Sequence, residues 1–524
     1  MSATDLLFDA LRAAGVRVRT RRASALAPVR EAGMRAEDWS TAAATAHVQG
    51  WRLAALWGEE SARYQLLNAL HERAGQYVAA RTRVRSATPR IDSIVHLYPA
   101  ADRLERHAHD LLGIDFQGHP DPRRWTRHQA WSAHEFPLRA GFTPRDGAPV
   151  TPPDVNYPFV TAHGAGVYEI PVGPVHAGII EPGHFRFLAV GEDVLSLEAR
   201  LGYVHKGIER IAQGRDAAGL ARLAARVSGD SAAAHAWAAC MAMERAARVS
   251  PPPRALALRG VLAEIERIVN HLWDIAAICN DVSYAFAYFQ LGRVVEDWRR
   301  INAAALGHRL LMDTIIPGGV ARDVGADAVH AILAQCAATR HELSEVWTIV
   351  QASDSLQDRL CTAGVLSAHD ARAFGAVGFV GRASAQDFDV RRDAPYAPYD
   401  ALAITVPCLS DGDIAARARI RHDEVLISLA LVESLLAALP GGEVSIAMRA
   451  PRTGAEGIGI VDGWRGEIVT HVRFAAHGRI ARFFPRDPSW LSWPTLERLI
   501  HGNIVPDFPV CNKSVNGSYS GHDL

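Results

Sequence analysis

The sequence predicts an α+β protein, in which a small N-terminal α/β domain (1–142) precedes a mainly helical domain (161–524) with β structure at both ends. Two observations support this division. The stretch 143–153 is rich in Pro and Gly and has no apolar periodicity, which is typical of a linker, placed here at 143–160. Beyond it, Ala-rich amphipathic segments dominate 201–439, and short strand-like segments flank them.

In the N-terminal domain, the pattern indicates strands or short helices at 48–57 and 77–84 and a strand at 91–98. A helix is predicted at 101–112, ending at Gly113.

The second domain begins with extended segments at 164–171 and 184–197, the latter a hairpin that turns at 191–193. Helices are predicted at 232–249, 260–278, 294–310, 326–350 and 414–439. Strands are predicted at 444–448, 457–461, 467–474 and 480–484.

The composition excludes several functional classes. With 524 residues, 49% of them hydrophobic, and a formal net charge of −1, the chain can bury a large core and has no basic surplus for nucleic acid. The N-terminus lacks the basic region and apolar core of a signal peptide. The most apolar stretch, 425–439, is shorter than the roughly 18 residues of a spanning helix and contains Glu433. We therefore expect a soluble chain that reaches a membrane only through partner subunits.

The cysteines are scattered along the chain. No two form a CxxC pair, so the local signature of a zinc or iron–sulfur site is missing. We interpret them as buried thiols in a reducing cytoplasm, while pairing in space stays open. They are Cys240, Cys279, Cys336, Cys361, Cys408 and Cys511.

A charged helix and turn carry the first specific motif. The segment 105–120 reads ERHAHDLLGIDFQGHP, with Arg123-Arg124 just beyond it and HEFPLR at 134–139. This motif resembles the signature of the small hydrophilic complex I subunit that lies beside the quinone-site subunit. One residue departs from it, because His107 stands where that family usually has glutamate.

Two further motifs follow the linker. The segment 173–187 reads GPVHAGIIEPGHFRF, and 201–210 reads LGYVHKGIER. Both resemble the opening of the group 4 [NiFe] hydrogenase large subunit, which is homologous to the quinone-site subunit of complex I. The segments 264–271, 307–309, 317–320 and 387–399 fit the same family. The chain thus resembles a fusion of two complex-I-type subunits, as in the large subunit of formate hydrogenlyase.

The thiolates that the resemblance implies are replaced at the first motif. The family holds its nickel–iron centre with RxCGxC and DPCxxC motifs. Here the first motif has Ser228 and Ser231 at the cysteine positions. A hydroxyl is a hard ligand that ionises far less readily than a thiol, so we expect no nickel–iron cluster and no metal.

The second motif allows two registers. Asp487-Pro488-Ser489 imitates DPCxxC, but the surrounding segment resembles a stretch that precedes this motif in complex I. We therefore interpret the tail as its counterpart, with Ser518 and Gly521 at the cysteine positions. Neither register retains a thiolate.

Several polar residues of the family's site are retained. Glu181 matches a proton-relaying glutamate, and Arg465 matches an arginine over the metal. His235 lies one helical turn beyond Ser231. We predict that Glu181, Arg465 and His235 are catalytic groups for proton handling. An inherited ion-pair network is the alternative, and it stays open.

Quinone binding is implied by ancestry but lacks its usual residues. The positions of the quinone-binding histidine and tyrosine are Pro182 and Gly229 here. Histidines flanking the first loop could substitute for them, although loop histidines also serve structural roles. The predicted quinone or substrate cavity contains His176, His184, Ser228, Asp230 and Ser231.

The resemblance implies a peripheral-arm subunit of a membrane-associated complex-I-like oxidoreductase. The expected partners are an iron–sulfur small subunit and antiporter-like membrane subunits, with no nucleic acid. The chain itself is expected to bind no cofactor other than a quinone, and to lie on the cytoplasmic side of the inner membrane. A non-catalytic scaffold and an active [NiFe] hydrogenase are the alternatives. Dinucleotide binding is not expected, because the glycines of 454–459 do not lie between a strand and a helix.

Overall fold

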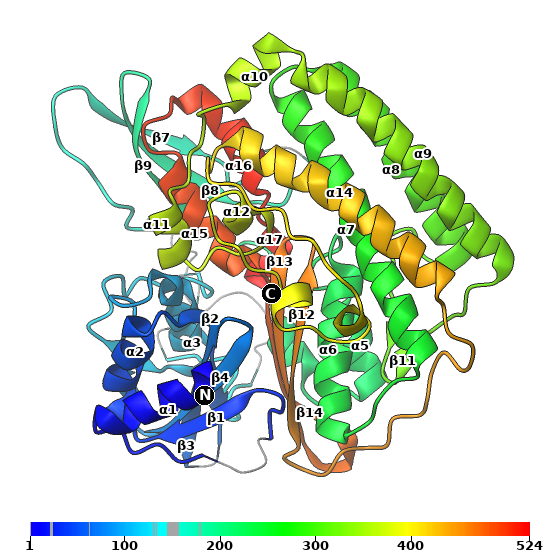
Figure 1. Cartoon of the computed structure of the whole chain (residues 1–524). Coiled ribbons are helices and arrows are strands. Elements are labelled where there is room, and N and C mark those ends of the chain that lie inside the picture. The colour runs from blue at the N-terminus through cyan, green and yellow to red at the C-terminus, as the bar shows by residue number, and fades with distance from the viewer. Residues whose placement is uncertain are drawn as a thin grey trace.

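The computed structural model describes residues 2–20, 25–61, 63–128, 131–132, 134–143, 157–176, 178 and 180–524. Of the predicted linker 143–160, residues 144–156 lie outside the described residues. The elements confirm the predicted α+β class: a β-rich N-terminal part is followed by long helices with sheets before and after them (Figure 1).

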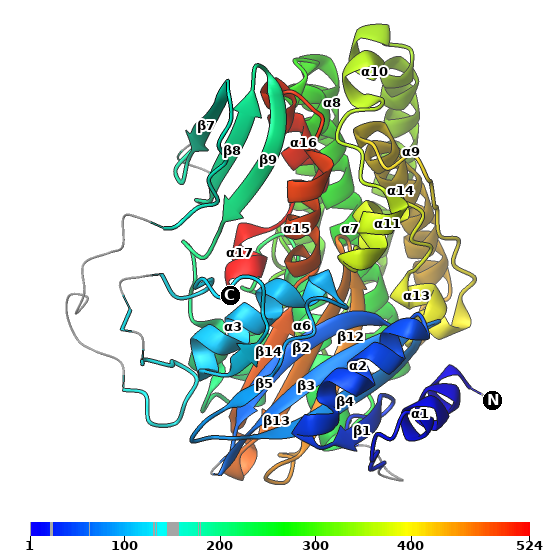
Figure 2. The same cartoon turned by 90° about the vertical axis from the view of Figure 1, so that its left-hand side faces the viewer.

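The N-terminal sheet has the strand order β1-β4-β3-β2, with β1 parallel to β4 and the other pairs antiparallel. Its strands are β1 (Arg30–Met34), β2 (Arg52–Glu60), β3 (Tyr64–Arg73) and β4 (Gln76–Arg85). Helices α1 (Ala3–Ala13) and α2 (Trp39–Val48) cover its outer face (Figure 2), where Leu7 and Phe8 pack with Ala46 and Val78. Helix α3 (Asp102–Leu112) packs on β2.

Two of the N-terminal predictions are confirmed. The segment 77–84 lies within β4, and 101–112 matches α3. Gly113 ends that helix with φ +71°, and a Cβ there would lie 2.7 Å from the ring of Phe136. The segment 48–57 covers the end of α2 and most of β2.

The predicted strand at 91–98 is wrong beyond its first residues. Strand β5 (Arg90–Asp92) pairs with β6 (Asp115–Gln117), and the chain then turns. The turn forms because Ser93 Oγ and the Ile94 amide both donate to the Glu105 carboxylate, at 2.7 and 2.9 Å. These bonds tie the backbone to α3 instead of to a neighbouring strand.

A three-stranded antiparallel meander opens the second part. It consists of β7 (Val167–Val172), β8 (His184–Val190) and β9 (Asp193–Arg200), and the hairpin turns at Gly191 as predicted. A second antiparallel sheet near the C-terminus contains β12 (Glu456–Gly463), β13 (Gly466–Phe474) and β14 (Ile480–Arg486). The β7–β9 meander lies at the upper left in both views, and the β12–β14 sheet extends from the centre of the molecule downward (Figures 1 and 2).

Long helices lie between these sheets in the sequence and contribute much of the hydrophobic core. They are α6 (Ala232–Ala247), α7 (Pro253–Asp281), α8 (Ala285–Ile301), α9 (Ala326–Gln351) and α14 (Ile414–Ala437). Helix α6 packs directly on β12, because Gly457 and Gly459 carry no side chain there. A Cβ at either glycine would lie about 2 Å from a carbonyl oxygen of α6.

Short elements connect this framework. They are α4 (Ile208–Ala212), α5 (Ala217–Ala224), β10 (Ile315–Ile316), β11 (Gly319–Val320), α10 (Asp354–Leu360), α11 (Ala368–Ala373), α12 (Gly378–Arg382), α13 (Val390–Asp393), α15 (Ser489–Leu499), α16 (Phe508–Val515) and α17 (Tyr519–Asp523).

Two predictions in the second part differ from the structure. The helix expected at 294–310 forms with shifted bounds, because α8 begins nine residues earlier, at Ala285, shortly after the left-handed Ser283, and continues as a short π-helix to Leu306 before the turn at Gly307. The strand expected at 444–448 does not form. Ser445 makes only an isolated bridge to Gly319, because β11 is too short to pair further.

The inner face of the N-terminal sheet packs against the β12–β14 sheet. Trp57 stacks on Phe484, and their ring centroids lie 5.5 Å apart. Arg52 Nη2 donates to Glu467 Oε2 at 2.6 Å, and Arg81 binds both carboxylate oxygens of Glu456 at 2.8 and 2.9 Å. Buried charges as well as apolar contacts therefore join the two parts.

Candidate functional site

The site is centred on Asp230, in the turn between α5 and α6. Arg465 Nη1 and Nη2 each donate to one oxygen of its carboxylate at 2.7 Å. Ser228 Oγ donates to Oδ1 at 2.7 Å. Partial burial acts to raise the pKa of Asp230, but Arg465 and Ser228 hold it below its usual value. The Asp230 side chain remains 38% exposed, so this ion pair is open to a ligand from outside the chain.

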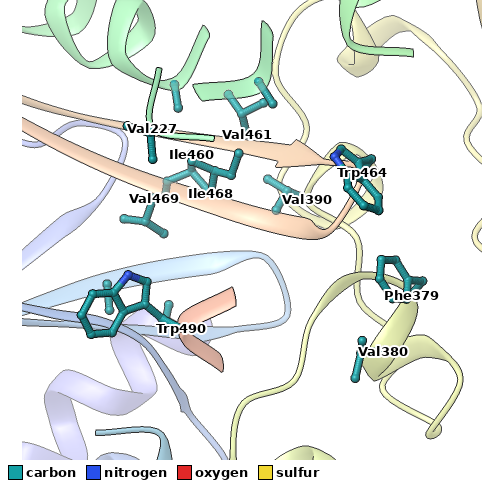
Figure 3. Packing of buried hydrophobic residues seen from close by; sticks show 14 of the residues in the cluster. Val227, Phe379, Val380, Val390, Ile460, Val461, Trp464, Ile468, Val469 and Trp490 are labelled. Carbon is teal, nitrogen blue, oxygen red and sulfur yellow. The ribbon is translucent and has the colours of Figure 1, made fainter. Parts of the chain in front are cut away.

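Neighbouring elements fix both partners of this ion pair. Glu266 of α7 accepts hydrogen bonds from the amides of Ala233 and Ala234, which caps the start of α6 directly after the turn. Arg465 lies at the turn between β12 and β13, where Trp464 Nε1 donates to the Asp230 carbonyl at 2.9 Å. Figure 3 shows Trp464 at this turn with Phe379 facing it, and their rings stack at 6.0 Å.

The residues that the sequence analysis assigns to the family's metal-ligand positions lie next to this pair. Ser228 Oγ and Ser518 Oγ lie 2.8 Å apart, although they are 290 positions apart in the chain. Ser231 Oγ donates to Asp230 Oδ1 at 3.3 Å. Ser489, which the alternative register places at a cysteine position, contacts the site through Ser518. Its Oγ accepts a hydrogen bond from the Ser518 amide at 2.8 Å.

Gly521 lies against a buried carboxylate. A Cβ at this position would approach Asp487 Cγ to 2.6 Å. Asp487 Oδ2 is hydrogen-bonded to His235 Nε2 at 2.7 Å, and its Oδ1 accepts from the Ser489 amide. Burial alone would raise the pKa of Asp487, but His235 and Arg465 hold it well below its usual value. The predicted catalytic His235 is therefore only 1% exposed and binds Asp487 through Nε2. Its buried Nδ1 has no hydrogen-bond partner among the described residues.

Glu181 lies in the loop before β8 and contacts the C-terminal helix α17. Its Oε2 accepts from the Ser520 amide at 2.8 Å. Lys206 Nζ donates to the carbonyl and the hydroxyl of the same serine, each at 2.8 Å. Burial raises the pKa of Glu181 despite the Ser520 amide and the charge of Lys206, and burial lowers the pKa of Lys206. The structure thus places Glu181 beside the tail rather than in contact with Arg465.

The two histidines of the predicted quinone cavity brace their own loop. His176 Nε2 is hydrogen-bonded to the Gly183 carbonyl at 2.7 Å, and His184 Nδ1 to the Gly173 carbonyl at 3.2 Å. Residues 177 and 179 of this loop lie outside the described residues. The structure joins Ser228, Asp230 and Ser231 into one site, and it ties His176 and His184 to the loop backbone instead.

Three residues that sequence reasoning did not assign to the site are Lys206, Glu266 and Asp487. Lys206 belongs to the quoted segment 201–210, so its motif was a signal for it. Asp487 was considered only as part of an alternative ligand motif. Glu266 belongs to the segment 264–271, but nothing in its spacing indicates that it caps α6.

The donor set does not match the four thiolates of a nickel–iron centre. The converging groups are three hydroxyls, a glycine and a carboxylate that already binds Arg465. Thiolates stabilise nickel and iron in low oxidation states, and hydroxyls do not replace them. Cys511, the cysteine nearest in sequence to the tail, is buried, and burial raises its pKa to about 12.

One other group in the described part of the chain has the spacing of metal ligands, namely Glu59, Glu456 and His471 between the two sheets. Arg81 binds both oxygens of Glu456, and Arg473 Nε lies 2.9 Å from Glu59 Oε2. These guanidinium groups already neutralise the carboxylates, so we interpret the group as part of the junction.

His107, the departure from the small-subunit signature, is also at this junction. Its Nε2 lies 2.6 Å from Glu209 Oε1 and its Nδ1 lies 2.7 Å from Thr126 Oγ1. Glu209 also forms an ion pair with Arg482. Although burial acts to raise the pKa of Glu209, Arg482 and His107 lower it to about 2.

The lowered pKa of Glu209 predicts a contribution to acid stability. Its stabilising effect is fully present above the ordinary pKa of 4.5 and is lost as the pH falls toward about 2. We expect Glu209→Gln to be less stable than the wild type above pH 4.5, and the difference to shrink below it. Urea denaturation of both proteins across this range checks the prediction. A difference that does not change with pH would contradict it.

No helix in the described part of the chain has the length and apolarity needed to cross a membrane.

Three family models match consecutive parts of the sequence. Residues 34–147 match the respiratory-chain NADH dehydrogenase 30 Kd subunit, 206–275 match nickel-dependent hydrogenase, and 285–457 match the respiratory-chain NADH dehydrogenase 49 Kd subunit. The matches follow the order expected from the motifs, with the small-subunit type first.

Whole proteins show the same combination. Hydrogenase-4 component G of Escherichia coli is 30% identical over 84% of this chain and 75% of its own length. The C/D protein of the NADH-quinone oxidoreductase of Phocaeicola vulgatus is 30% identical over 78% of this chain and 82% of its own length. A chain of the archaeal membrane-bound sulfane sulfur reductase has the same fold, with a TM-score of 0.64 and 23% identity over 68% of this chain and 99% of that chain. The chain therefore belongs to the family that unites the 49 Kd and 30 Kd subunits of complex I with the large subunits of group 4 [NiFe] hydrogenases.

Proposed function

We propose that the chain is a peripheral-arm subunit of a membrane-associated, complex-I-like or hydrogenase-4-like oxidoreductase. In this role it passes electrons from an iron–sulfur cluster of a partner protein to a quinone or another acceptor, with proton uptake through Glu181. The observation that carries the proposal is the half-open ion pair of Arg465 and Asp230, at the place where the Ser228 and Ser518 hydroxyls meet. The hydroxyls at the ligand positions argue against an active [NiFe] hydrogenase.

The retained groups suit the reduction of an acceptor. Reduction of a quinone to a quinol takes two electrons, here from the partner's cluster, and two protons. A carboxyl group with a raised pKa, such as Glu181, keeps its proton to a higher pH than an ordinary glutamate and can donate it to the acceptor. The guanidinium of Arg465 can stabilise negative charge that develops on the acceptor. His235, which Asp487 holds, would support the position of the tail rather than contact the acceptor.

Apolar side chains around Glu181 support a partner on this face. Val175 is 75% exposed, and Ile180 and Tyr203 are also exposed. The loops that carry them both contact α17, through Glu181 and through the amides of Gly202 and Val204, which donate to Asp523. We propose that an iron–sulfur small subunit packs over this rim, and that antiporter-like membrane subunits hold the assembly at the cytoplasmic side of the inner membrane.

The role of Glu181 predicts the behaviour of Glu181→Gln. We expect quinone reduction by the purified complex to fall about ten-fold, because the amide cannot donate a proton. The raised pKa of Glu181 means that the wild-type rate falls as the pH rises through it, and this dependence should be absent in the variant. Glu169→Gln is the matched control, since Glu169 is exposed on β7 and pairs with Arg186.

A non-catalytic scaffold is the second candidate function, and one observation favours it. The polar groups of the site satisfy one another: Glu181 binds the Ser520 amide, Arg465 binds Asp230 and the Asn516 carbonyl, and Ser228 binds Ser518. Unchanged turnover in both Glu181→Gln and Arg465→Ala, within assembled complexes, would favour the scaffold and contradict the catalytic roles.

A further inference from the structure

A fully buried cluster of charges lies behind the turn that carries Arg465. Its side chains come from α7, α12, α13, α14, β12 and the segment before α13, and each is at most 1% exposed. Figure 3 shows Val390 of α13 and Phe379 of α12 close to Trp464 at the end of the β12–β13 hairpin. The carboxylates are Glu264, Asp389, Glu424 and Asp462, and the guanidinium groups are Arg267, Arg382 and Arg391.

Three of the four carboxylates bind a guanidinium group directly. Arg391 donates to Asp389 Oδ2 at 2.7 Å and to both oxygens of Glu264 at 3.0 Å. Arg382 donates to Glu424, with Nε at 3.0 Å from Oε1. Glu264 also accepts from Tyr399 and Ser428, so this carboxylate is fully ligated.

Asp462 is the carboxylate without such a partner. Its nearest guanidinium nitrogen, Arg267 Nη2, lies 3.6 Å from Oδ1 and donates to the Asp462 backbone carbonyl instead, at 2.9 Å. Oδ2 accepts only the amide of Val390, at 3.1 Å. Within the described part of the chain, Oδ1 has no hydrogen-bond partner.

The charge count points the same way. Four carboxylates face three guanidinium groups in a region without solvent contact, which leaves one negative charge without compensation. His271 binds Glu424 rather than Asp462, and burial lowers its pKa, so it does not supply the missing positive charge. A buried carboxylate without a counter-charge binds a proton instead.

We propose that Asp462 is an internal proton-binding site directly behind the hairpin that carries Arg465. The groups that face it are Arg267 of α7, Arg382 of α12, Asp389, Arg391 of α13 and Tyr396, whose hydroxyl accepts the Asp462 amide.

The electrostatics agree with this assignment. Burial and then the charge of Asp389 raise the pKa of Asp462 to about 7, and the three arginines only partly offset them. The proton is therefore close to half-occupancy at neutral pH, so a small change in the surrounding charge would load or release it.

Asp462 lies close enough to the Arg465–Asp230 ion pair for a change of charge there to alter its protonation. Arg267 donates to the carbonyls of Asp462 and Gly463, and Arg465 follows two residues later in the same turn. Because this short stretch of chain places the two sites near each other, negative charge that arrives at Arg465 and Asp230 would electrostatically raise the proton affinity of Asp462. Storage of a proton during turnover rests on the proposed function, whereas protonation of Asp462 does not.

Infrared spectroscopy of the purified full-length protein tests the site. We expect the C=O band of a protonated carboxyl group that disappears with a midpoint at pH about 7. The band should shift when the protein is labelled with ¹³C-carboxyl aspartate, and glutamate labelling should leave it in place. Asp462→Asn should remove it.

Asp281→Asn is the matched control, because burial also raises the pKa of Asp281, which lies outside the cluster. The band should persist in this variant. A wild-type spectrum without an aspartate-derived band in this range would overturn the proposal, even if Asp462→Asn fails to fold. The proposed function fails separately, if Glu181→Gln keeps its full rate of quinone reduction.

Discussion

Replacing Glu467 with glutamine is expected to lower the free energy of unfolding by about 3–5 kcal/mol. The Glu467 carboxylate is fully buried and accepts hydrogen bonds from Arg52, from the Tyr77 hydroxyl and from Arg486. Burial acts to raise its pKa, but the two arginines lower it, so the group is charged at neutral pH. The amide would leave the buried Arg486 guanidinium without its ion-pair partner, and Arg52 would be paired with Glu72 alone.

Urea denaturation measures this loss, with Glu433→Gln as the control. Glu433 forms an ion pair with Arg340 in which both side chains are more than a third exposed, so its replacement should cost less than about 1 kcal/mol. Equal effects of the two substitutions would show that the buried carboxylate does not hold the sheets together.

Placing a cysteine at Gly521 is expected to destabilise the protein by about 2–3 kcal/mol, as overpacking of a rigid site does. The new Cβ would approach Asp487 Cγ to 2.6 Å. Asp487 has little room to move, because His235 and the Ser489 amide hold its two oxygens. A thiolate next to this carboxylate would also add like-charge repulsion.

Ser518→Cys is the matched control, because it adds no new branch to the backbone and changes only Oγ to Sγ. We expect it to cost less than half as much in thermal or urea denaturation. A Gly521→Cys protein as stable as the wild type would show that Asp487 can move aside.

A variant with cysteines at 228, 231, 518 and 521 should accordingly fail to bind stoichiometric nickel in a metal analysis.

Long helices were the part of the fold that could be predicted from the sequence. Helices α6, α7, α9 and α14 each run for at least 16 residues and are rich in good helix formers, so their length and composition indicate a helix even where, as in α6, nearly all residues are buried. Strand β3 was missed, because a second sheet covers its inner face and removes the usual alternation of apolar and polar residues. It buries Asn68 and His71 along with its leucines, so its sequence does not resemble a half-exposed strand.

The candidate site, like the fold, could be predicted only in part from the sequence. Motif spacing located Ser228, Asp230, Arg465 and Ser518, and the structure brings these residues together. The contact of Glu181 with the Ser520 amide and the position of Asp487 against Gly521 depend on packing between segments more than 30 residues apart in the chain. No local sequence pattern encodes such contacts. The sequence therefore identified the functional side chains but not the residues that they contact.

The hydrogen bonds that fix helix α17 have a consequence for how the sequences of relatives can differ. Glu181 and Lys206 bind the amide and carbonyl of Ser520, and His205 and the Lys206 amide bind the carbonyls of Asp523 and Leu524. Because these bonds involve main-chain atoms, they would form equally well with a different side chain at 520, and only the two bonds of the Ser520 hydroxyl, to Lys206 and to the Val227 carbonyl, would be lost. Relatives should therefore keep an acidic residue at 181 and a basic one at 206 more strictly than a serine at 520.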